Sequence, residues 1–295
     1  MTPRPHLELH LAVLLAGLTA VLGELISISA LPLVWWRVLI AAVSFVPLYF
    51  LLKSKSKLTR RNTLQLLAIG GLVGLHWVTF YGSVKLANAS VALVCFALVS
   101  PLTALLEPLL LGQRFDRKEF ALGCLVLPGM VLVAGVIDTS YHAGFVVGIV
   151  SALLAAVFAT LNKRYVARVR PVDLSLVEMS GAWVTLSLLY PALARADLGG
   201  GEAFWPSPSD WIYLLVLALA CTTLAFLLAT RALQHLSAFT TNLAYALEPV
   251  YGIILASVLL GQHQELSPAF YLGAALITLA VVVHALLARR AKRTT

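Results

Sequence analysis

Long apolar stretches recur along the whole chain and are separated by short polar segments. A window of about 20 residues, the length that crosses a bilayer as a helix, picks out these stretches. The pattern therefore predicts an all-α integral membrane protein with ten transmembrane helices. They lie near residues 9–28, 32–52, 64–84, 89–111, 119–137, 143–163, 173–194, 210–230, 236–260 and 267–288.

The second half of the chain repeats part of the first. Residues 75–113, shifted by 149 positions, fall on residues 224–262, and both segments close on Leu-Leu-Gly-Gln. Each half contains five predicted helices, which is an odd number, so the two halves enter the membrane in opposite directions. We therefore predict two inverted five-helix repeats, 1–138 and 139–295. This plan is typical of secondary transporters, whose substrate site lies between the repeats.

The composition supports a membrane protein and excludes a soluble domain. Hydrophobic residues make up 60% of the chain and charged residues 12%, with a mean hydropathy of +0.93, against about 45–50% and about 25% in soluble domains. Cys95, Cys124 and Cys221 all lie inside apolar segments without metal-ligand spacing. We therefore expect no disulfide framework, no metal site and no cofactor.

Basic residues lie almost entirely on one side of the predicted membrane. Of the 21 Lys and Arg residues, 18 fall at the ends or in the loops that this topology places together. Lys85 and Arg195 lie on the other side, and Arg37 lies within a span. The positive-inside rule then places both termini in the cytoplasm. Because the net charge of +8 follows the topology, we expect no nucleic-acid partner.

Three segments resemble a known transporter family. They read WWRVLIAA at 35–42, LANASVALV at 86–94 and LEPVYGIILASVLLGQ at 247–262. With the duplicated plan, they resemble the drug/metabolite transporter superfamily in its ten-helix EamA type. The resemblance implies a carrier of the bacterial inner membrane, of a kind that often exports amino acids or other small metabolites. Both copies of the repeated segment end in Gly-Gln, at 112–113 and 261–262, where the family commonly has Gly-Glu. That difference weakens any role for an acid there.

Polar and aromatic side chains inside the apolar segments mark a candidate cavity. In segments 89–111 and 236–260 they recur at spacings of three and four residues, so each set shares one face of its helix. Two such stripes that face a common interior would line a polar chamber. The predicted substrate-binding residues, two of them from segment 64–84 and one from segment 143–163, are Trp77, Tyr81, Ser100, Thr103, Asn162, Thr241, Tyr245 and Glu248.

Some of these residues also have a structural interpretation. Tyr81 lies near the end of its segment and could belong to an interfacial aromatic belt, and Asn162 could bond to a neighbouring helix. Glu248 lies near the middle of its predicted helix, where a charge costs at least about 2.5–3.5 kcal/mol. It therefore binds substrate or exchanges protons, or else it only caps distorted backbone near Pro249 or pairs with a buried cation.

Four further residues are candidates for proton coupling or gating: Glu24, Arg37, His76 and Glu107. Glu24 and Arg37 have similar depths in the first two helices. We predict a salt bridge between them, which could serve as an outer gate; the alternative is contact with the substrate. His76 is a candidate proton relay or a hydrogen-bonded packing residue. Glu107 lies about one turn from the cytoplasmic end of its helix.

The sequence contains no phosphate-binding loop for ATP and no recognised catalytic motif. We therefore expect a carrier rather than an enzyme. It would work by alternating access around a cavity lined by the first, third, fourth, sixth, eighth and ninth predicted helices. The expected partners are the lipid bilayer and a small-molecule substrate such as an amino acid. The expected state is a monomer. The alternatives are an intramembrane enzyme and a channel-like facilitator.

Overall fold

The computed structural model describes residues 4–53, 56–134, 142–195, 203–245 and 247–259, with short pieces between 272 and 283. All regular elements in these ranges are helices. They are α1 (Arg4–Leu25), α2 (Ala30–Leu51), α3 (Arg60–Leu86), α4 (Ala89–Phe96), α5 (Val99–Leu111), α6 (Arg117–Ala134), α7 (His142–Val166), α8 (Pro171–Leu193), α9 (Pro208–Ala218), the π-helix η2 (Leu219–Leu224), α10 (Ala225–Leu233), α11 (Ala238–Tyr245) and α12 (Glu248–Leu259).

Among the residues that the structure describes, six helical runs are long and apolar enough to cross a bilayer. Five are single helices, and the sixth joins α9, η2 and α10 from Pro208 to Leu233. The shorter α5 is also apolar. The predicted all-α membrane fold is therefore confirmed at this level. The count of ten stays a prediction, because segment 267–288 and the basic tail lie largely outside the described residues.

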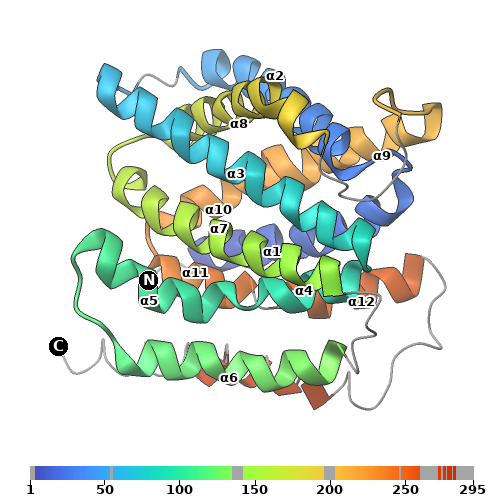
Figure 1. The fold of residues 1–295 in the computed structure, drawn as a ribbon. Coiled ribbons are helices and arrows are strands. Elements are labelled where there is room, and N and C mark those ends of the chain that lie inside the picture. The colour runs from blue at the N-terminus through green and yellow to red at the C-terminus, as the bar shows by residue number, and fades with distance from the viewer. Residues whose placement is uncertain are drawn as a thin grey trace.

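The helices lie side by side in a bundle (Figure 1). α2, α3 and α8 form one side of it, and α6 lies on the opposite side, against α5. α1 passes through the middle and packs on α10 and α12, while α7 contacts both α3 and α5. The first and last thirds of the described chain thus meet in the centre.

Glycines allow α3 and α8 to approach closely. A Cβ atom added at Gly70 would lie 2.0 Å from the carbonyl oxygen of Glu178, and one added at Gly181 would lie 2.3 Å from that of Leu67. No side chain fits in so little space. The backbones of the two helices are therefore in direct contact, as is common between membrane helices.

Each repeat contains a helix that is interrupted at the equivalent position. α4 ends at Phe96 and α5 begins at Val99, while α11 ends at Tyr245 and α12 begins at Glu248. The 149-residue shift carries the first pair of helix ends onto the second. Pro101 and Pro249 follow the breaks and lack the N–H that would bond the fourth carbonyl back. Figure 1 shows the pair α4–α5 running opposite to the pair α11–α12, so equivalent segments are inverted.

Candidate substrate cavity

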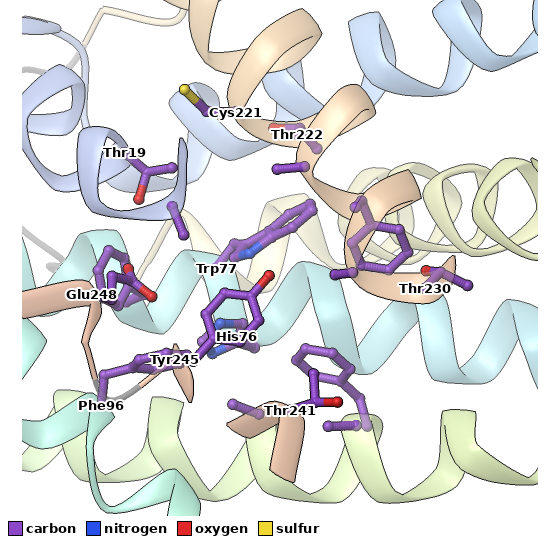
Figure 2. Close-up of a pocket in the computed structure, with 18 of the residues that line it drawn as sticks. Thr19, His76, Trp77, Phe96, Cys221, Thr222, Thr230, Thr241, Tyr245 and Glu248 are labelled. Atoms are coloured by element: carbon purple, nitrogen blue, oxygen red, sulfur yellow. The ribbon is translucent and has the colours of Figure 1, made fainter. Parts of the chain in front are cut away.

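A cavity lies between the two broken helices and the helices packed around them (Figure 2). Its empty volume is about 930 Å³, including the part that is open to the surroundings. Side chains from α1, α3, α4, α7, α10, α11 and α12 line it, together with residues of η2. These elements cover all six helices predicted to form the wall. α2 was not among the predicted wall helices, and it contributes Arg37.

Five of the eight predicted substrate-binding residues lie on the cavity wall: Trp77, Asn162, Thr241, Tyr245 and Glu248. Figure 2 shows Trp77, Tyr245 and Glu248 around the same space. The five come from α3, α7, α11 and α12. Residues far apart in the sequence are therefore brought together, although their role in binding stays a prediction.

The other three predicted residues are buried but lie off the wall. Tyr81 donates its hydroxyl to the carbonyl of Thr19 at 3.4 Å. Ser100 and Thr103 are fully buried in α5. α5 packs on α6 near Ser100, since a Cβ added at Gly123 would lie 3.3 Å from the carbonyl carbon of Ser100. The predicted stripe assumed one continuous helix, and the break at 97–98 interrupts it.

Arg37 is held at the cavity by three contacts. Its Nε donates to Oγ1 of Thr222 at 2.6 Å, and its Nη1 donates to the Tyr81 hydroxyl at 3.0 Å. The guanidinium carbon lies 4.0 Å from the centroid of the Trp77 ring, a cation–π geometry. Only 3% of Arg37 is exposed. The buried cation is thus fixed by neutral partners, which leaves its charge available to a ligand.

The predicted salt bridge between Glu24 and Arg37 is wrong. Glu24 is exposed, and it accepts a hydrogen bond from the backbone N–H of Ala89 at 3.1 Å. Ala89 begins α4, where the first N–H groups have no partner within the helix. The similar depths of the two residues in the predicted membrane do not specify how each helix is rotated about its own axis. Glu24 stays at the bundle end, while Arg37 points to the centre.

A π-helical turn positions the partner of Arg37. Within η2, Thr222 donates its hydroxyl to the carbonyl of Leu217 at 2.7 Å, and Thr223 donates to that of Ala218 at 3.0 Å. Such single turns often occur at functional sites, because the extra residue redirects the side chains that follow. Nothing in the apolar pattern of 210–230 indicates this insertion, so the sequence did not predict it.

His76 joins α3 to α7. Its Nδ1 lies 3.0 Å from the carbonyl oxygen of Ser151, and the Ser151 hydroxyl donates to the carbonyl of His76 at 3.1 Å. Nδ1 also lies 2.8 Å from the hydroxyl of Ser151. The ring stacks on Phe96 at 5.5 Å and lies 5.5 Å from Phe158. These contacts fit the packing interpretation, and a proton relay stays a prediction.

Glu248 is the first residue of α12, directly after the helix break. It is 4% exposed and lines the cavity. With the residues that the structure describes, its side chain forms no hydrogen bond and no ion pair within 4.0 Å, although the charge of Arg37 acts on it. The free N–H groups at a helix start favour a negative charge there. Glu248 thus presents an uncommitted carboxylate to the cavity.

Two acidic residues complete the polar interior. Glu107, a candidate for coupling, is 5% exposed and lies off the cavity wall in α5. Glu178 of α8 is fully buried and accepts a hydrogen bond from Nδ2 of Asn162 at 3.2 Å. Glu178 was not among the predicted site residues. An acidic residue inside the apolar segment 173–194 is the signal that could have found it.

Comparison with known proteins identifies the family of the chain. The model of the EamA-like transporter family matches residues 6–135 and 142–286. The chain belongs to the EamA-like transporter family. The family has a two-repeat architecture, which agrees with the paired helix breaks, and the resemblance seen in the sequence is confirmed.

Other proteins resemble this EamA-like transporter over much of its length. The uncharacterized transporter YxxF of Bacillus subtilis (strain 168) is 24% identical over 214 residues. That match covers 71% of this chain and 66% of the relative's length. A crystal structure described only as that of a protein matches with a TM-score of 0.74 and 21% identity, and covers 97% of this chain and 98% of the other. This last likeness establishes the fold.

Proposed function

We propose that this EamA-family membrane transporter carries amino acids or similar zwitterionic metabolites. The observation that carries the proposal is the opposite charge of Arg37 and Glu248 on one cavity wall. Neither residue is neutralised by the other at close range. A substrate carboxylate would meet the guanidinium of Arg37, and its ammonium group would meet Glu248. Charge-assisted hydrogen bonds of this kind are among the stronger ones in proteins.

The cavity walls suit the side chain of such a substrate. Trp77 faces Phe226 at 6.3 Å between ring centroids, and Phe158 lies beside His76. Ligand sites are commonly apolar surfaces with a few polar groups that fix orientation. A polyanion is disfavoured, because Arg37 is the only Lys or Arg among the lining residues described.

We propose that transport proceeds by alternating access and that the chain is an exporter. Polar contacts hold both ends of the bundle. At one end, Ser27 donates its N–H and its hydroxyl to Asp210, each at 2.7 Å. At the other end, Lys163 donates to the carbonyls of Leu233 and Leu236. Breaking one set while keeping the other would open the cavity to one side at a time. The export direction follows the family resemblance.

We also propose a location in the bacterial inner membrane with both termini cytoplasmic. In Figure 1 the start of α1, the connection from α5 to α6 and that from α7 to α8 lie at the same end of the bundle. The last two connections carry basic residues, among them Arg114, Arg168 and Arg170. A monomer would suffice, since each repeat has its inverted partner within the chain.

The test is counterflow in proteoliposomes with a matched ligand series. An amino acid, its decarboxylated amine and its deaminated acid are each offered to the wild type and to Glu248→Gln. We expect only the amino acid to exchange efficiently, and the variant to bind it roughly 10- to 100-fold more weakly, because one charge-assisted hydrogen bond is lost. Glu119→Gln, a carboxylate away from the cavity wall, is the control.

Three outcomes would argue against this function. Equal exchange of the amine and the amino acid would remove the role of Arg37. Flux that neither saturates nor shows counterflow would indicate the channel-like alternative. A new chemical product from the purified protein would indicate an intramembrane enzyme.

A further inference from the structure

Glu178 is a buried carboxylate that the substrate cavity does not use. It is fully buried in α8, and its Oε1 has no hydrogen-bond partner among the described residues. Its Oε2 accepts from Nδ2 of Asn162 at 3.2 Å. Oδ1 of Asn162 also has no partner there. Each member of the pair therefore has one polar atom without a partner, which is costly in an apolar interior.

The pair adjoins the cavity. Asn162 lies on the cavity wall, whereas Glu178 is shielded behind it. On the side of α3, Gly70 brings the backbone against Glu178 itself. Asn162 thus links Glu178 to the cavity wall.

No positive charge neutralises Glu178 in the described part of the chain. α8 packs on α2, α3, α7 and α10. Their charged and titratable side chains are exposed or engaged elsewhere, as are those of α8 itself. On α2 and α3, Arg60 and Arg61 are exposed, Arg37 binds Tyr81 and Thr222, Tyr49 packs on Phe50, His76 binds Ser151, and Lys85 binds the carbonyl of Ile26. On α7 and α10, His142 is exposed, Lys163 and Arg164 bind the carbonyls of Leu233 and Leu110, Tyr165 binds Gln65, and Arg231 pairs with Glu8. On α8 itself, Asp173 accepts from Ser56, and Tyr190 packs on Phe204.

We propose that Glu178 and Asn162 form a proton-binding site that is coupled to the substrate cavity. An ionised carboxylate with a single neutral donor is poorly stabilised in an apolar interior, so the site requires a proton or a metal cation. Oε1 is enclosed and has almost no accessible surface. A proton needs no room beside that oxygen, whereas a sodium ion needs space and several oxygen ligands. The geometry therefore favours the proton.

The coupling runs through the two ends of one amide. When Glu178 is ionised, Nδ2–H of Asn162 donates to it, and Oδ1 of Asn162 is enclosed with almost no accessible surface. A proton that enters from the cavity forms an O–H bond on Glu178. That hydroxyl donates to Oδ1 once the amide has turned. The proton returns to the cavity when the O–H bond breaks and the carboxylate reforms. Proton occupancy thus changes the orientation of the Asn162 amide, and Asn162 lines the cavity. This part rests on the proposed function.

Carbodiimide labelling tests the site without any substrate. An apolar carbodiimide reacts with protonated carboxyl groups in apolar surroundings, and mass spectrometry locates the adduct. In purified protein we expect an adduct at Glu178 that decreases as the pH is raised. Sodium at constant pH should not protect it. Protection by sodium would replace the proton with a metal ion and overturn the proposal.

Infrared spectroscopy provides a second readout in case the reagent cannot reach the residue. The carbonyl stretch of a protonated carboxyl group should be stronger in Glu248→Gln than in Glu178→Gln/Glu248→Gln. Glutamine has the shape of protonated glutamate, so the variant should fold. An unchanged band in both proteins, with no adduct at Glu178, would refute the site.

A transport measurement tests the coupling separately. The ratio of wild-type exchange rates at acidic and alkaline pH should differ from one, and in Glu178→Gln it should approach one. Failure to find any transported amino acid would contradict the proposed function but leave the labelling result intact. A protonated Glu178 whose replacement leaves the pH ratio unchanged would refute the coupling alone.

Discussion

Arg37 and Thr222 join the two repeats across the cavity. The Nε of Arg37 donates to Oγ1 of Thr222 at 2.6 Å, although the residues are 185 positions apart. Thr222 in turn donates to the carbonyl of Leu217 inside the π-helical turn. The orientation of a buried cation in one half therefore depends on one irregular turn in the other.

Replacing Arg37 with lysine should weaken substrate binding strongly. Lysine keeps the charge but lacks the planar fork that contacts Thr222, Tyr81 and the Trp77 face together. We expect the apparent affinity for an amino acid in counterflow to fall roughly 10- to 100-fold, the effect of about 1.5–3 kcal/mol for a lost charged hydrogen bond.

Thr222→Val is the matched variant for this prediction. It removes the hydroxyl but keeps the size of the side chain and the charge of Arg37. We expect a smaller loss than in Arg37→Lys, on the order of tenfold or less, since one neutral hydrogen-bond acceptor is lost. Wild-type affinity in Arg37→Lys would show that the guanidinium does not contact the substrate.

Close contact between α3 and α8 predicts that Gly70 and Gly74 of α3 differ in their tolerance of alanine. Alanine at Gly70 would place its Cβ 2.0 Å from the Glu178 carbonyl oxygen, whereas at Gly74 the nearest neighbour is 3.3 Å away. Overpacking of this kind costs about 1–3 kcal/mol. Gly70→Ala should lower the thermal unfolding midpoint in detergent clearly, and Gly74→Ala only slightly. Equal midpoints for both variants would contradict the observed packing.

The apolar pattern was sufficient to predict the class of fold. The length and hydropathy of segments such as 32–52 and 173–194 predict that each crosses the membrane. Inside the bilayer the backbone N–H and C=O groups must bond to each other, so such a segment forms a helix. The repeat could also be read from the sequence, since the 149-residue shift carries the end of α4 and the start of α5 onto the end of α11 and the start of α12. What an apolar pattern cannot specify is the rotation of each helix about its own axis.

Helix rotation explains the errors at the site. Glu24 and Arg37 have matching depths yet point to different places, because packing on neighbouring helices sets their direction. Ser100 left the predicted stripe because of a break within its helix. The importance of Glu178 became visible only when its unpaired oxygen and its contact with Asn162 were known. The sequence thus predicted residues of the cavity wall more readily than the contact between Asn162 and Glu178 behind that wall.

Cys221 offers a native reporter of cavity access. It is 4% exposed and lines the cavity. In a Cys95→Ser/Cys124→Ser background, a charged thiol reagent added to the Asp210 side should react faster after Ser27→Ala. This substitution removes one of the two hydrogen bonds that Ser27 donates to Asp210. One such bond is worth about 0.5–1.5 kcal/mol, so we expect a roughly 2- to 10-fold faster reaction.

The control for this variant is Ser44→Ala. It breaks the hydroxyl pair between Ser44 and Thr223 at 2.7 Å, which joins α2 to η2 away from Ser27. Labelling from the Asp210 side should stay near the wild-type rate. If Ser27→Ala reacts no faster than Ser44→Ala, the contact between Ser27 and Asp210 does not close that end.

The opposite end should respond in the opposite sense. Lys163 donates to the carbonyls of Leu233, the last residue of α10, and of Leu236, which follows the helix. Lys163→Met keeps the length of the side chain but removes these donors, so the end of the bundle that carries Lys163 should open more often. In the same reporter background, Cys221 should then react faster from the Lys163 side and slower from the Asp210 side. Inside-out and right-side-out vesicles separate the two faces. A variant that speeds labelling equally from both sides would mean that the bundle has loosened as a whole, and alternating access through these two contacts would be excluded.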